Sequence, residues 1–231
     1  MRSSNVLDAS GLFLGKGLYS VAFASRLTAV SEEKIRRWMF GGKTRLSLLQ
    51  PDFGDQDVRV LSFLDLIEIM LVDAFRQRGV SSQHIRKVAA KAEQELGTPH
   101  PFAHKRFLTD GRRIFVEELH GDQKQLSDFL RDQREFREFV EDSLHKGVEF
   151  DVSDIANRWR PNPRLPSVII DPLRSFGQPI VDRTRTPTAA LFRTYRGTGS
   201  IDEAAATYDV SVDEARQAIE FETGLEGRAA A

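Results

Sequence analysis

Histidine and carboxylate side chains are the groups through which this sequence would bind a metal ion or transfer protons. His100 and His104 stand four residues apart, as two ligands on one helical face do, but Pro101 lies between them and interrupts such a helix. No further ligand cluster accompanies the pair. We therefore predict no metal site. The other three histidines are His84, His120 and His145.

The acidic residues Asp65, Glu68 and Asp73 lie near one another along one predicted helix. Paired carboxylates serve general acid–base catalysis, but charged residues on a helix are more often simply hydrated, and we interpret these three as solvated. The glycines of residues 11–17 match neither the dinucleotide-binding nor the phosphate-loop spacing. The sequence therefore predicts no catalytic residues and no cofactor.

The composition is that of a globular protein. The chain has 231 residues, of which 40% are hydrophobic and 29% charged, with a net charge of −1 and no cysteine. The lack of cysteine excludes disulfides, thiolate metal sites and cysteine nucleophiles within this sequence. No apolar run approaches the ~18 residues of a membrane span, and the first residues lack a signal-peptide core. A cytoplasmic protein is therefore expected.

Nucleic-acid binding has better physical support than catalysis, because a group of cations follows a helix-turn-helix spacing. The phosphates of DNA require cations, and the major groove admits one helix. Lys34, Arg36 and Arg37 lie on the outward face of the second helix, which enters the groove in such motifs. A solvated face is the alternative, and the motif favours DNA over it. The predicted DNA-binding residues are Ser31, Lys34, Arg36, Arg37, Lys43 and Arg45.

Two short helices and a hairpin are expected to position these cations. Ser20 is a good N-cap for the first helix and Ser31 for the second, which ends at Gly41-Gly42. Two β-prone runs, residues 43–49 and 58–61, flank a turn rich in Pro, Asp and Gly. A hairpin in this place is the wing of a winged helix-turn-helix.

A second helix pair followed by a hairpin is expected over residues 62–118. Ser62 and Asp65 form a capping pair for its first helix, and a short turn leads to the second. The Asp110-Gly111 pair is typical of a two-residue hairpin turn. It predicts strands over residues 102–107 and 112–118.

The remaining chain is expected to hold one long helix, a boundary and a small helical domain. Residues 125–146 predict a charged amphipathic helix, whose apolar face packs within the monomer or forms a dimer contact. The proline-rich segment 158–166 cannot be a helix interior and is the best domain boundary. Short strands are predicted over residues 168–172 and 177–181. The helix-start signals beyond them are Thr186-Pro187, Ser200 with Glu203, and Ser211 with Glu214.

These elements together predict a mainly α fold with short β-hairpins, in which tandem winged helix-turn-helix modules precede a small helical C-terminal domain. The net charge falls from +3 over residues 1–60 to −2 over residues 161–231, which suggests different partners at the two ends. The predicted units are a winged helix-turn-helix at 1–61, a second helix-turn-helix with hairpin at 62–118, a connecting helix and linker at 119–160, and a helical domain at 161–231.

Residues 167–221 resemble a small domain that occurs in VapB-like antitoxins. The shared pattern runs from Asp171-Pro172 through Gly177-Gln178-Pro179-Ile180 to Arg183-Thr184-Arg185-Thr186-Pro187. A helix, an acidic helix start and a final helix-turn-helix follow. This sequence departs from the pattern with Arg183 in place of a glycine and Thr186 in place of an aliphatic residue.

The first part of the chain resembles a MerR-type winged helix. The residues that carry this likeness are Tyr19 to Ala24, then Val30-Ser31, then Ile35-Arg36-Arg37-Trp38, in the usual order. The two resemblances together cover most of the chain.

The resemblance implies a DNA-binding antitoxin that represses its own operon and neutralises a PIN-like ribonuclease toxin. Helix-turn-helix proteins commonly bind DNA as two-fold dimers, so a homodimer is also expected. The last helix, residues 212–223, is acidic and repels phosphate, so we expect a protein partner or simple solvation there rather than DNA. The alternative is a MerR-like transcriptional regulator whose C-terminal domain senses a ligand or dimerises, without a toxin partner. The predicted partner-binding residues are Arg183, Arg185, Phe192, Tyr195, Asp213, Glu214 and Glu220.

Overall fold

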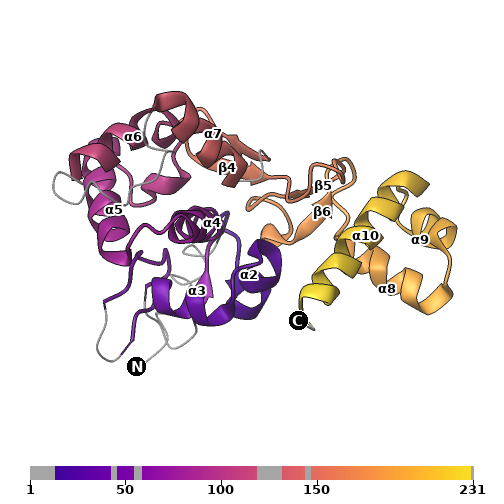
Figure 1. Cartoon of the computed structure of the whole chain (residues 1–231). Helices are drawn as coiled ribbons and strands as arrows, with labels where there is room; N and C mark the ends of the chain where they lie inside the picture. Colours follow the sequence, from indigo (N-terminus) through magenta and orange to yellow (C-terminus); the bar gives the residue numbers. More distant parts are fainter. Residues whose placement is uncertain (1–13, 43–45, 55–58, 119–131, 144–146, 230–231) are drawn as a thin grey trace, which may run out of the picture.

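The computed structural model describes residues 14–42, 46–54, 59–118, 132–143 and 147–229 and is mostly helical (Figure 1). No helix in these ranges combines the length and apolar character needed to cross a bilayer. The helices are α2 (Val21–Thr28), α3 (Glu32–Met39), α4 (Phe63–Gln77), α5 (Ser82–Leu96), α6 (Phe107–Glu118), α7 (Gln133–Ser143), α8 (Thr188–Thr198), α9 (Ile201–Thr207) and α10 (Val212–Ala229), with short 3-10 turns η1 (Pro101–Ala103) and η3 (Ser175–Gly177). The strands are β1 (Tyr19–Ser20), β2 (Val60–Leu61), β3 (Val148–Phe150), β4 (Ala156–Trp159), β5 (Val168–Ile170) and β6 (Pro179–Val181).

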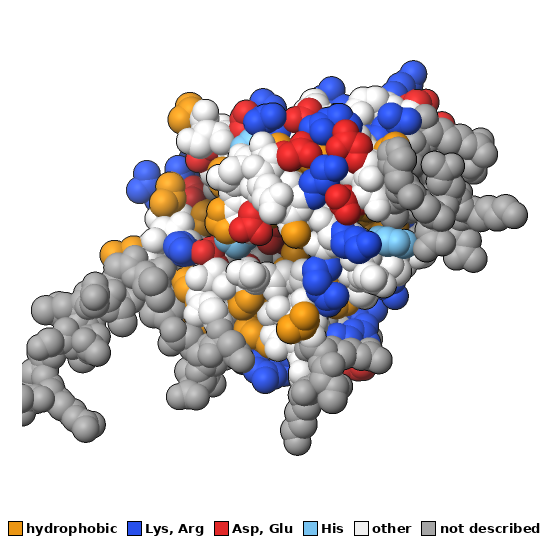
Figure 2. All heavy atoms as spheres, turned by 90° about the vertical axis from the view of Figure 1, so that its left-hand side faces the viewer, with side chains coloured by type: hydrophobic (Ala, Val, Ile, Leu, Met, Phe, Trp, Pro, Cys, Tyr) orange, Lys and Arg blue, Asp and Glu red, His pale blue; other side chains and the backbone are white. Residues whose placement is uncertain are grey.

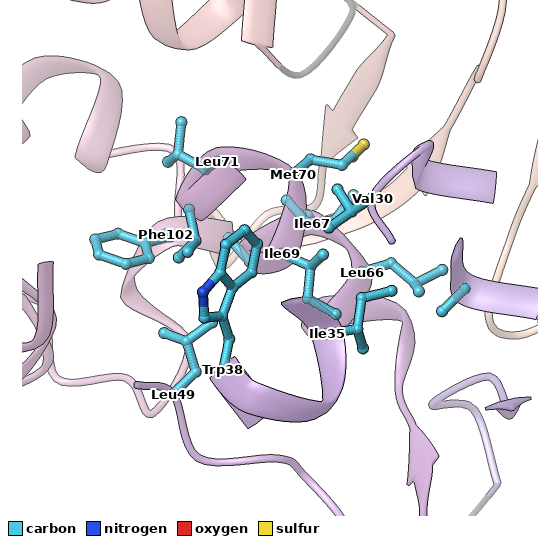
Figure 3. Packing of buried hydrophobic residues seen from close by; sticks show 14 of the residues in the cluster. Val30, Ile35, Trp38, Leu49, Leu66, Ile67, Ile69, Met70, Leu71 and Phe102 are labelled. Atoms are coloured by element: carbon cyan, nitrogen blue, oxygen red, sulfur yellow. The ribbon is translucent and has the colours of Figure 1, made fainter. Parts of the chain in front are cut away.

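Helix α4 lies at the centre of the larger hydrophobic core and is buried around most of its circumference. Its start is a capping box, because Ser62 Oγ accepts from the N–H of Asp65 while the Asp65 carboxylate accepts from the N–H of Ser62. Ile69 of α4 lies beside Trp38 of α3, and Leu66 of α4 lies beside Ile35 (Figure 3). The capping pair predicted for this helix is confirmed.

The first two predicted helices are confirmed as α2 and α3. Ser20 Oγ accepts from the N–H of Phe23, and Ser31 Oγ accepts from the N–H of Lys34, so both predicted N-caps form. Ala29 adopts a left-handed conformation (φ 59°) and turns the chain between the two helices. Three residues separate α2 from α3.

The first predicted hairpin is wrong for the residues that the structure describes. Residues 46–49 form no strand, because the N–H groups of Leu48 and Leu49 both donate to the Trp38 carbonyl at the end of α3. The side chains of both leucines are buried in the larger hydrophobic core. The other predicted strand exists in part as β2, but β2 pairs antiparallel with β1. Residues 43–45 and 55–58 of the predicted wing lie outside the described residues.

The second predicted hairpin is also wrong, since residues 107–118 form helix α6. Phe107, Gly111, Ile114 and Phe115 recur at helical spacing and are all buried, which outweighs the local turn preference of the Asp-Gly pair. A methyl group on Gly111 would come within 3.0 Å of the Phe107 and Phe136 rings, so glycine is needed there for close packing rather than for a turn.

Helix α7 confirms residues 133–143 of the amphipathic helix predicted over 125–146, and residues 119–131 and 144–146 are outside the described chain. Phe136 and Val140 are buried and Phe139 is partly buried against the larger core, so this part of the apolar face packs within the monomer. Phe136 joins a cluster of edge-to-face and tilted rings. The cluster comprises Phe75, Phe102, Phe107, Phe115, Phe136 and Phe139.

A four-stranded antiparallel sheet of order β3-β4-β5-β6 connects the helical layers. Strands β5 and β6 confirm the two predicted strands with shorter bounds, whereas β3 and β4 were not predicted. Trp159 of β4 pairs with Ile170 of β5, so the sheet joins the chain on both sides of the boundary expected at residue 160.

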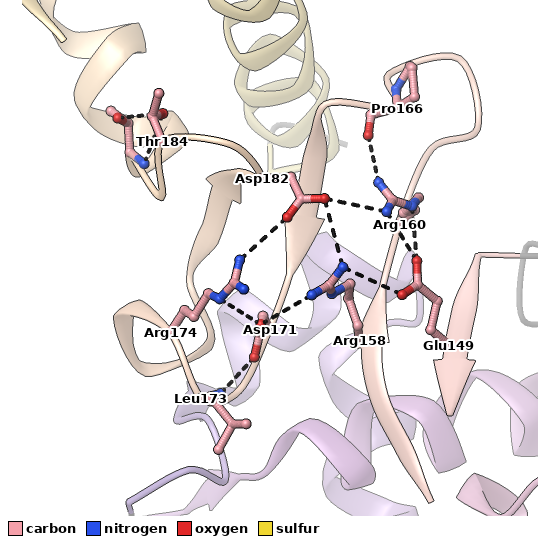
Figure 4. A network of polar contacts seen from close by, with 10 residues as sticks. Glu149, Arg158, Arg160, Pro166, Asp171, Leu173, Arg174, Asp182 and Thr184 are labelled. Atoms are coloured by element: carbon pink, nitrogen blue, oxygen red, sulfur yellow. Dashed lines mark hydrogen bonds and ion pairs between the residues drawn. The ribbon is translucent and has the colours of Figure 1, made fainter. Parts of the chain in front are cut away.

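Three arginines and three carboxylates bind one another across this sheet (Figure 4). Arg160 contacts Glu149 and Asp182, and Arg174 contacts Asp171 and Asp182. The network ties both edge strands to the centre of the sheet. Its remaining member is Arg158, which lies near Glu149, Asp171 and Asp182.

Helices α8, α9 and α10 enclose a second, smaller core. The reciprocal capping box of Ser211 and Glu214 is confirmed, and Ser200 Oγ accepts from the N–H of Glu203 as predicted. Helix α8 begins one residue later than the Thr186-Pro187 signal indicates, with Pro187 in the cap position.

The last helix returns to the first part of the chain (Figure 1). Phe221 and Leu225 of α10 belong to the larger core, and the Arg228 guanidinium donates to the carbonyls of Arg26 and Leu27 at the end of α2. These carbonyls lack partners within the helix, and a cation is favourable at that end of the helix dipole.

The aromatic cluster predicts a large effect of Phe115. Truncation by Phe115→Ala removes a fully buried ring and should lower the free energy of unfolding by about 3–5 kcal/mol. Urea denaturation measures it. Val116→Ala, at the exposed neighbouring position, should change the value by less than about 1 kcal/mol. Equal effects of the two changes would contradict this account of the core.

Candidate nucleic-acid interface and partner surface

Helix α3 presents the cations that were predicted to meet DNA. Ile35, Trp38 and Met39 are buried, which turns Arg36 and Arg37 outward. The preceding turn is held by Thr28, whose hydroxyl donates to the Ala24 carbonyl and accepts from the N–H of Val30. The helix therefore has a fixed direction relative to α2.

Arg36 and Arg37 each pair with a glutamate one turn earlier on α3. Arg36 lies 2.5 Å from Glu32, and Arg37 lies 3.7 Å from Glu33. Exposed pairs of this spacing contribute only about 0.3–0.5 kcal/mol, so a phosphate can replace the carboxylate at little cost. Both arginines are thus placed to bind an external anion.

Lys34 differs from the two arginines, because its ammonium turns toward α4 and lies 2.8 Å from the Asp73 carboxylate. Ser31, Arg36 and Arg37 are all exposed, whereas Lys34 is partly buried and paired with α4. The remaining predicted DNA-binding residues, Lys43 and Arg45, lie outside the described residues.

Two further cations beside this surface were not predicted as site residues. Arg86 of α5 donates to the carbonyls of Leu46 and Ser47, which places α5 beside the segment that follows α3. Lys87 is exposed next to it. The inward spacing of Ile85 and Val88 indicates that both cations point away from the core, but no local sequence signal places α5 next to residues 46–47.

The surface over α5 and α6 carries mixed charges (Figure 2). Lys91 pairs with Glu117, and Arg113 pairs with both Glu95 and Glu117. This face offers no uniform positive field of the kind that attracts nucleic acid.

In the C-terminal part, Arg183 binds within the protein. Its guanidinium donates to both carboxylate oxygens of Glu214, at 3.0 and 2.9 Å, and to the Asp209 carbonyl. The hydrogen bonds from Arg183 lower the pKa of Glu214 to about 2. The pair fastens the turn before α8 to the start of α10, so the arginine that replaces a glycine of the antitoxin pattern has a structural contact.

The other predicted partner-binding residues do not form one group. Arg185 is exposed with a left-handed backbone (φ 63°), and no carboxylate pairs with it in the described part of the chain. Phe192 is half-buried under Arg196, and Tyr195 packs against the smaller core. Asp213 binds Arg216 and Gln217, and Glu220 is exposed beside a cleft of about 230 Å³.

The acidic residues of α4 are buried, so the expectation that they are solvated is wrong. Asp65 and Glu68 are fully buried and Asp73 nearly so. Distant segments supply partners for Glu68 and Asp73, while the N–H of Ser62 supplies one for Asp65. Glu68 accepts from the N–H of Phe102 at 3.2 Å and lies 3.1 Å from His100 Nδ1.

His100 lies between two carboxylates. Its Nδ1 faces Glu68, and its Nε2 lies 3.4 Å from Asp52, which also binds Lys16 at 2.7 Å. Burial alone would lower the pKa of His100, but the hydrogen bonds to Asp52 and Glu68 outweigh burial and raise it to about 10. Burial raises the pKa of Asp65 to about 7.

The donor atoms of Asp65, Glu68 and His100 lie within 4.8 Å of one another, which is close enough to consider a metal ion. An imidazole binds metal through an unprotonated nitrogen. Both ring nitrogens of His100 face carboxylates, and this geometry favours an imidazolium ion that donates to each of them. The cluster therefore fits a structural ion network better than a metal site.

The chain resembles known proteins in its fold and in its sequence. No known family model matches the chain. The fold is similar to the X-ray crystal structure of Rv2018 from Mycobacterium tuberculosis, with a TM-score of 0.67 and 24% sequence identity over 87% of this chain and 96% of that chain.

A sequence relative comes from the same organism. The chain is 26% identical over 223 residues to the protein named "Putative antitoxin VapB45" of Mycobacterium tuberculosis (strain ATCC 25618 / H37Rv), and the alignment covers 88% of this chain and 92% of that protein. The resemblance to VapB-like antitoxins thus agrees with a distant relative matched along nearly its whole length.

The His100 cluster predicts pH-dependent stability. A folded-state pKa raised from about 6.5 to about 10 gives stability that is present below pH 6.5 and is lost as the pH rises. Between pH 7 and 9 the free energy of unfolding should fall by about 2 kcal/mol, as measured by urea denaturation. His100→Gln should flatten this decline, whereas His84→Gln should retain it. A decline of the same size in His100→Gln would contradict the assignment.

Proposed function

We propose that this chain is the DNA-binding antitoxin of a type II toxin–antitoxin system, which represses its own operon and neutralises a PIN-like ribonuclease. The observation that carries the proposal is its similarity to a named antitoxin over 88% of the chain. The described geometry adds a capped helix pair, α2 and α3, whose second helix turns two arginines outward.

The DNA contact is assigned to the surface of α3. Arg36 and Arg37 are the cations that reach phosphates or base edges, because within the described ranges only exposed glutamates compete for them. Ser31 caps the helix at the end that approaches the groove. A homodimer would place two such helices on an inverted repeat.

The toxin contact is assigned to the C-terminal helical unit, about residues 165–223. The front part of the chain has an excess of cations and this part an excess of carboxylates. Ribonucleases bind an anionic substrate and therefore present cationic surface, to which exposed carboxylates such as Asp213 and Glu220 are complementary. Arg185 is the exposed cation that would approach the acidic nuclease site.

Replacement of Arg36 tests DNA binding. Arg36→Ala should weaken binding to the DNA upstream of the chain's own reading frame by about 1–3 kcal/mol, since it removes a groove contact. Gel shifts at one fixed salt concentration measure the change. Arg216→Ala removes an exposed, ion-paired arginine from α10 and is the matched control, with unchanged affinity. An unaltered affinity of Arg36→Ala would exclude this interface.

Charge reversal at Arg185 tests the partner surface. Arg185→Glu should lower affinity for the nuclease encoded by the adjacent reading frame at least about tenfold, because it repels active-site carboxylates. Pull-down and rescue of growth in co-expressing cells measure it, while DNA binding is unchanged. Arg164→Glu is the matched control, since Arg164 is also exposed and pairs with no carboxylate in the described ranges. Normal neutralisation by Arg185→Glu would move the toxin contact elsewhere.

A further inference from the structure

The ion pair of Lys34 and Asp73 connects the surface of α3 to the central helix α4. The Lys34 ammonium lies 2.8 Å from Asp73 Oδ1 and 5.9 Å from the centre of the Trp38 ring. The other carboxylate oxygen of Asp73 accepts from Gln77 at 2.5 Å. The lysine ammonium is thus held at α4, although the side chain is 42% exposed.

Burial distinguishes this pair from the other two pairs on α3. The Asp73 side chain is 11% exposed, whereas the side chains of Glu32 and Glu33 are 43% and 88% exposed. Water screens the two exposed carboxylates, and it screens Asp73 much less. Asp73 therefore holds its cation more firmly than Glu32 and Glu33 hold theirs.

Asp73 also faces a cleft, which makes the pair reversible. The cleft has a volume of about 520 Å³ and lies between the α2–α3 turn, α4 and α7. Asp73 and Gln77 line it together, so the carboxylate would retain the Gln77 hydrogen bond and gain water if Lys34 moved away. The lysine can leave without isolating a buried charge.

We propose that Asp73 is a positioning residue that withholds Lys34 from DNA, so that this side chain and phosphate compete for the same ammonium. This inference rests on the proposed DNA contact of α3. In the native chain, Arg36 and Arg37 supply the phosphate contacts of the helix and Lys34 supplies none. Operator affinity is consequently lower than the three cations of α3 would give if all were available.

Neutralising Asp73 should add one phosphate contact. Asp73→Asn keeps the size and the hydrogen-bonding capacity of the side chain but not its charge. It should raise operator affinity roughly tenfold, and it should steepen the dependence of log K on log salt by about 0.9, the value of one additional released counterion. Lys34→Ala in the native background should leave the salt slope unchanged, because that lysine makes no phosphate contact there.

The experiment measures binding of the full chain to its upstream DNA across a series of potassium chloride concentrations. The proteins are the native chain, Asp73→Asn, Lys34→Ala and the double variant. The gain of Asp73→Asn should disappear in the double variant, which assigns it to Lys34. Gln77→Ala removes the neighbouring hydrogen bond but retains the carboxylate, and it should leave the salt slope unchanged.

A second measurement needs no DNA. Acetylation of Lys34 by an N-hydroxysuccinimide ester, followed by mass spectrometry, should be several-fold faster in Asp73→Asn than in the native chain. Lys87, exposed on α5, should react equally in both and serves as the internal reference.

The outcomes separate this inference from the proposed function. Absence of DNA binding by all of the proteins would contradict the proposed function. Binding by the native chain with the same affinity and salt slope in Asp73→Asn would overturn the role of Asp73. A loss of salt slope in Lys34→Ala alone would do the same, even if Asp73→Asn failed to fold.

Discussion

Burial of charge on α4 is the constraint on which the arrangement of the front half depends. A helix that carries Asp65, Glu68 and Asp73 cannot lie in the centre of a core unless each carboxylate finds a partner, since an unpaired buried charge is very costly. Each partner comes from a different segment, and each segment is thereby fixed against α4.

The partners of the three carboxylates come from three segments that pack against α4. The backbone before the helix satisfies Asp65, the residues around η1 satisfy Glu68, and α3 satisfies Asp73 through Lys34. His100 also contacts Asp52, and it thereby connects Glu68 of α4 to the turn that follows residues 46–49. Hydrophobic packing provides most of the stability, while these polar contacts select one orientation for each surrounding segment.

The features that the sequence predicts well are those whose partners lie within one helical turn. Ser20, Ser31, Ser62 and Ser211 cap helices through backbone groups three residues away, and all four were predicted. The outward direction of Arg36 follows from the helical spacing of Ile35 and Trp38 in the same way. A short stretch of sequence is enough to predict such local geometry.

The features that it does not predict depend on distant partners. The pairs Lys34–Asp73 and His100–Glu68 join residues 39 and 32 positions apart, so the sequence alone does not indicate that these two acids are buried. The hairpin predicted in place of α6 rests on the local Asp-Gly signal, whereas the Phe136 ring that packs against this helix comes from another element. The partner surface was predicted from charge, but the fold shows that Arg183 forms an ion pair with Glu214 of the same chain.

The contact of Arg228 with the carbonyls of α2 has a consequence for biosynthesis. Arg228 lies 202 and 201 positions after the two residues whose carbonyls it contacts. Phe221 and Leu225 of the same helix are part of the larger core. Contacts of such high sequence separation form slowly and late. While the ribosome is still adding the last helix, the apolar groove that α10 will fill is exposed and the end of α2 lacks its cation. Apolar surface exposed at that stage favours aggregation until α10 docks.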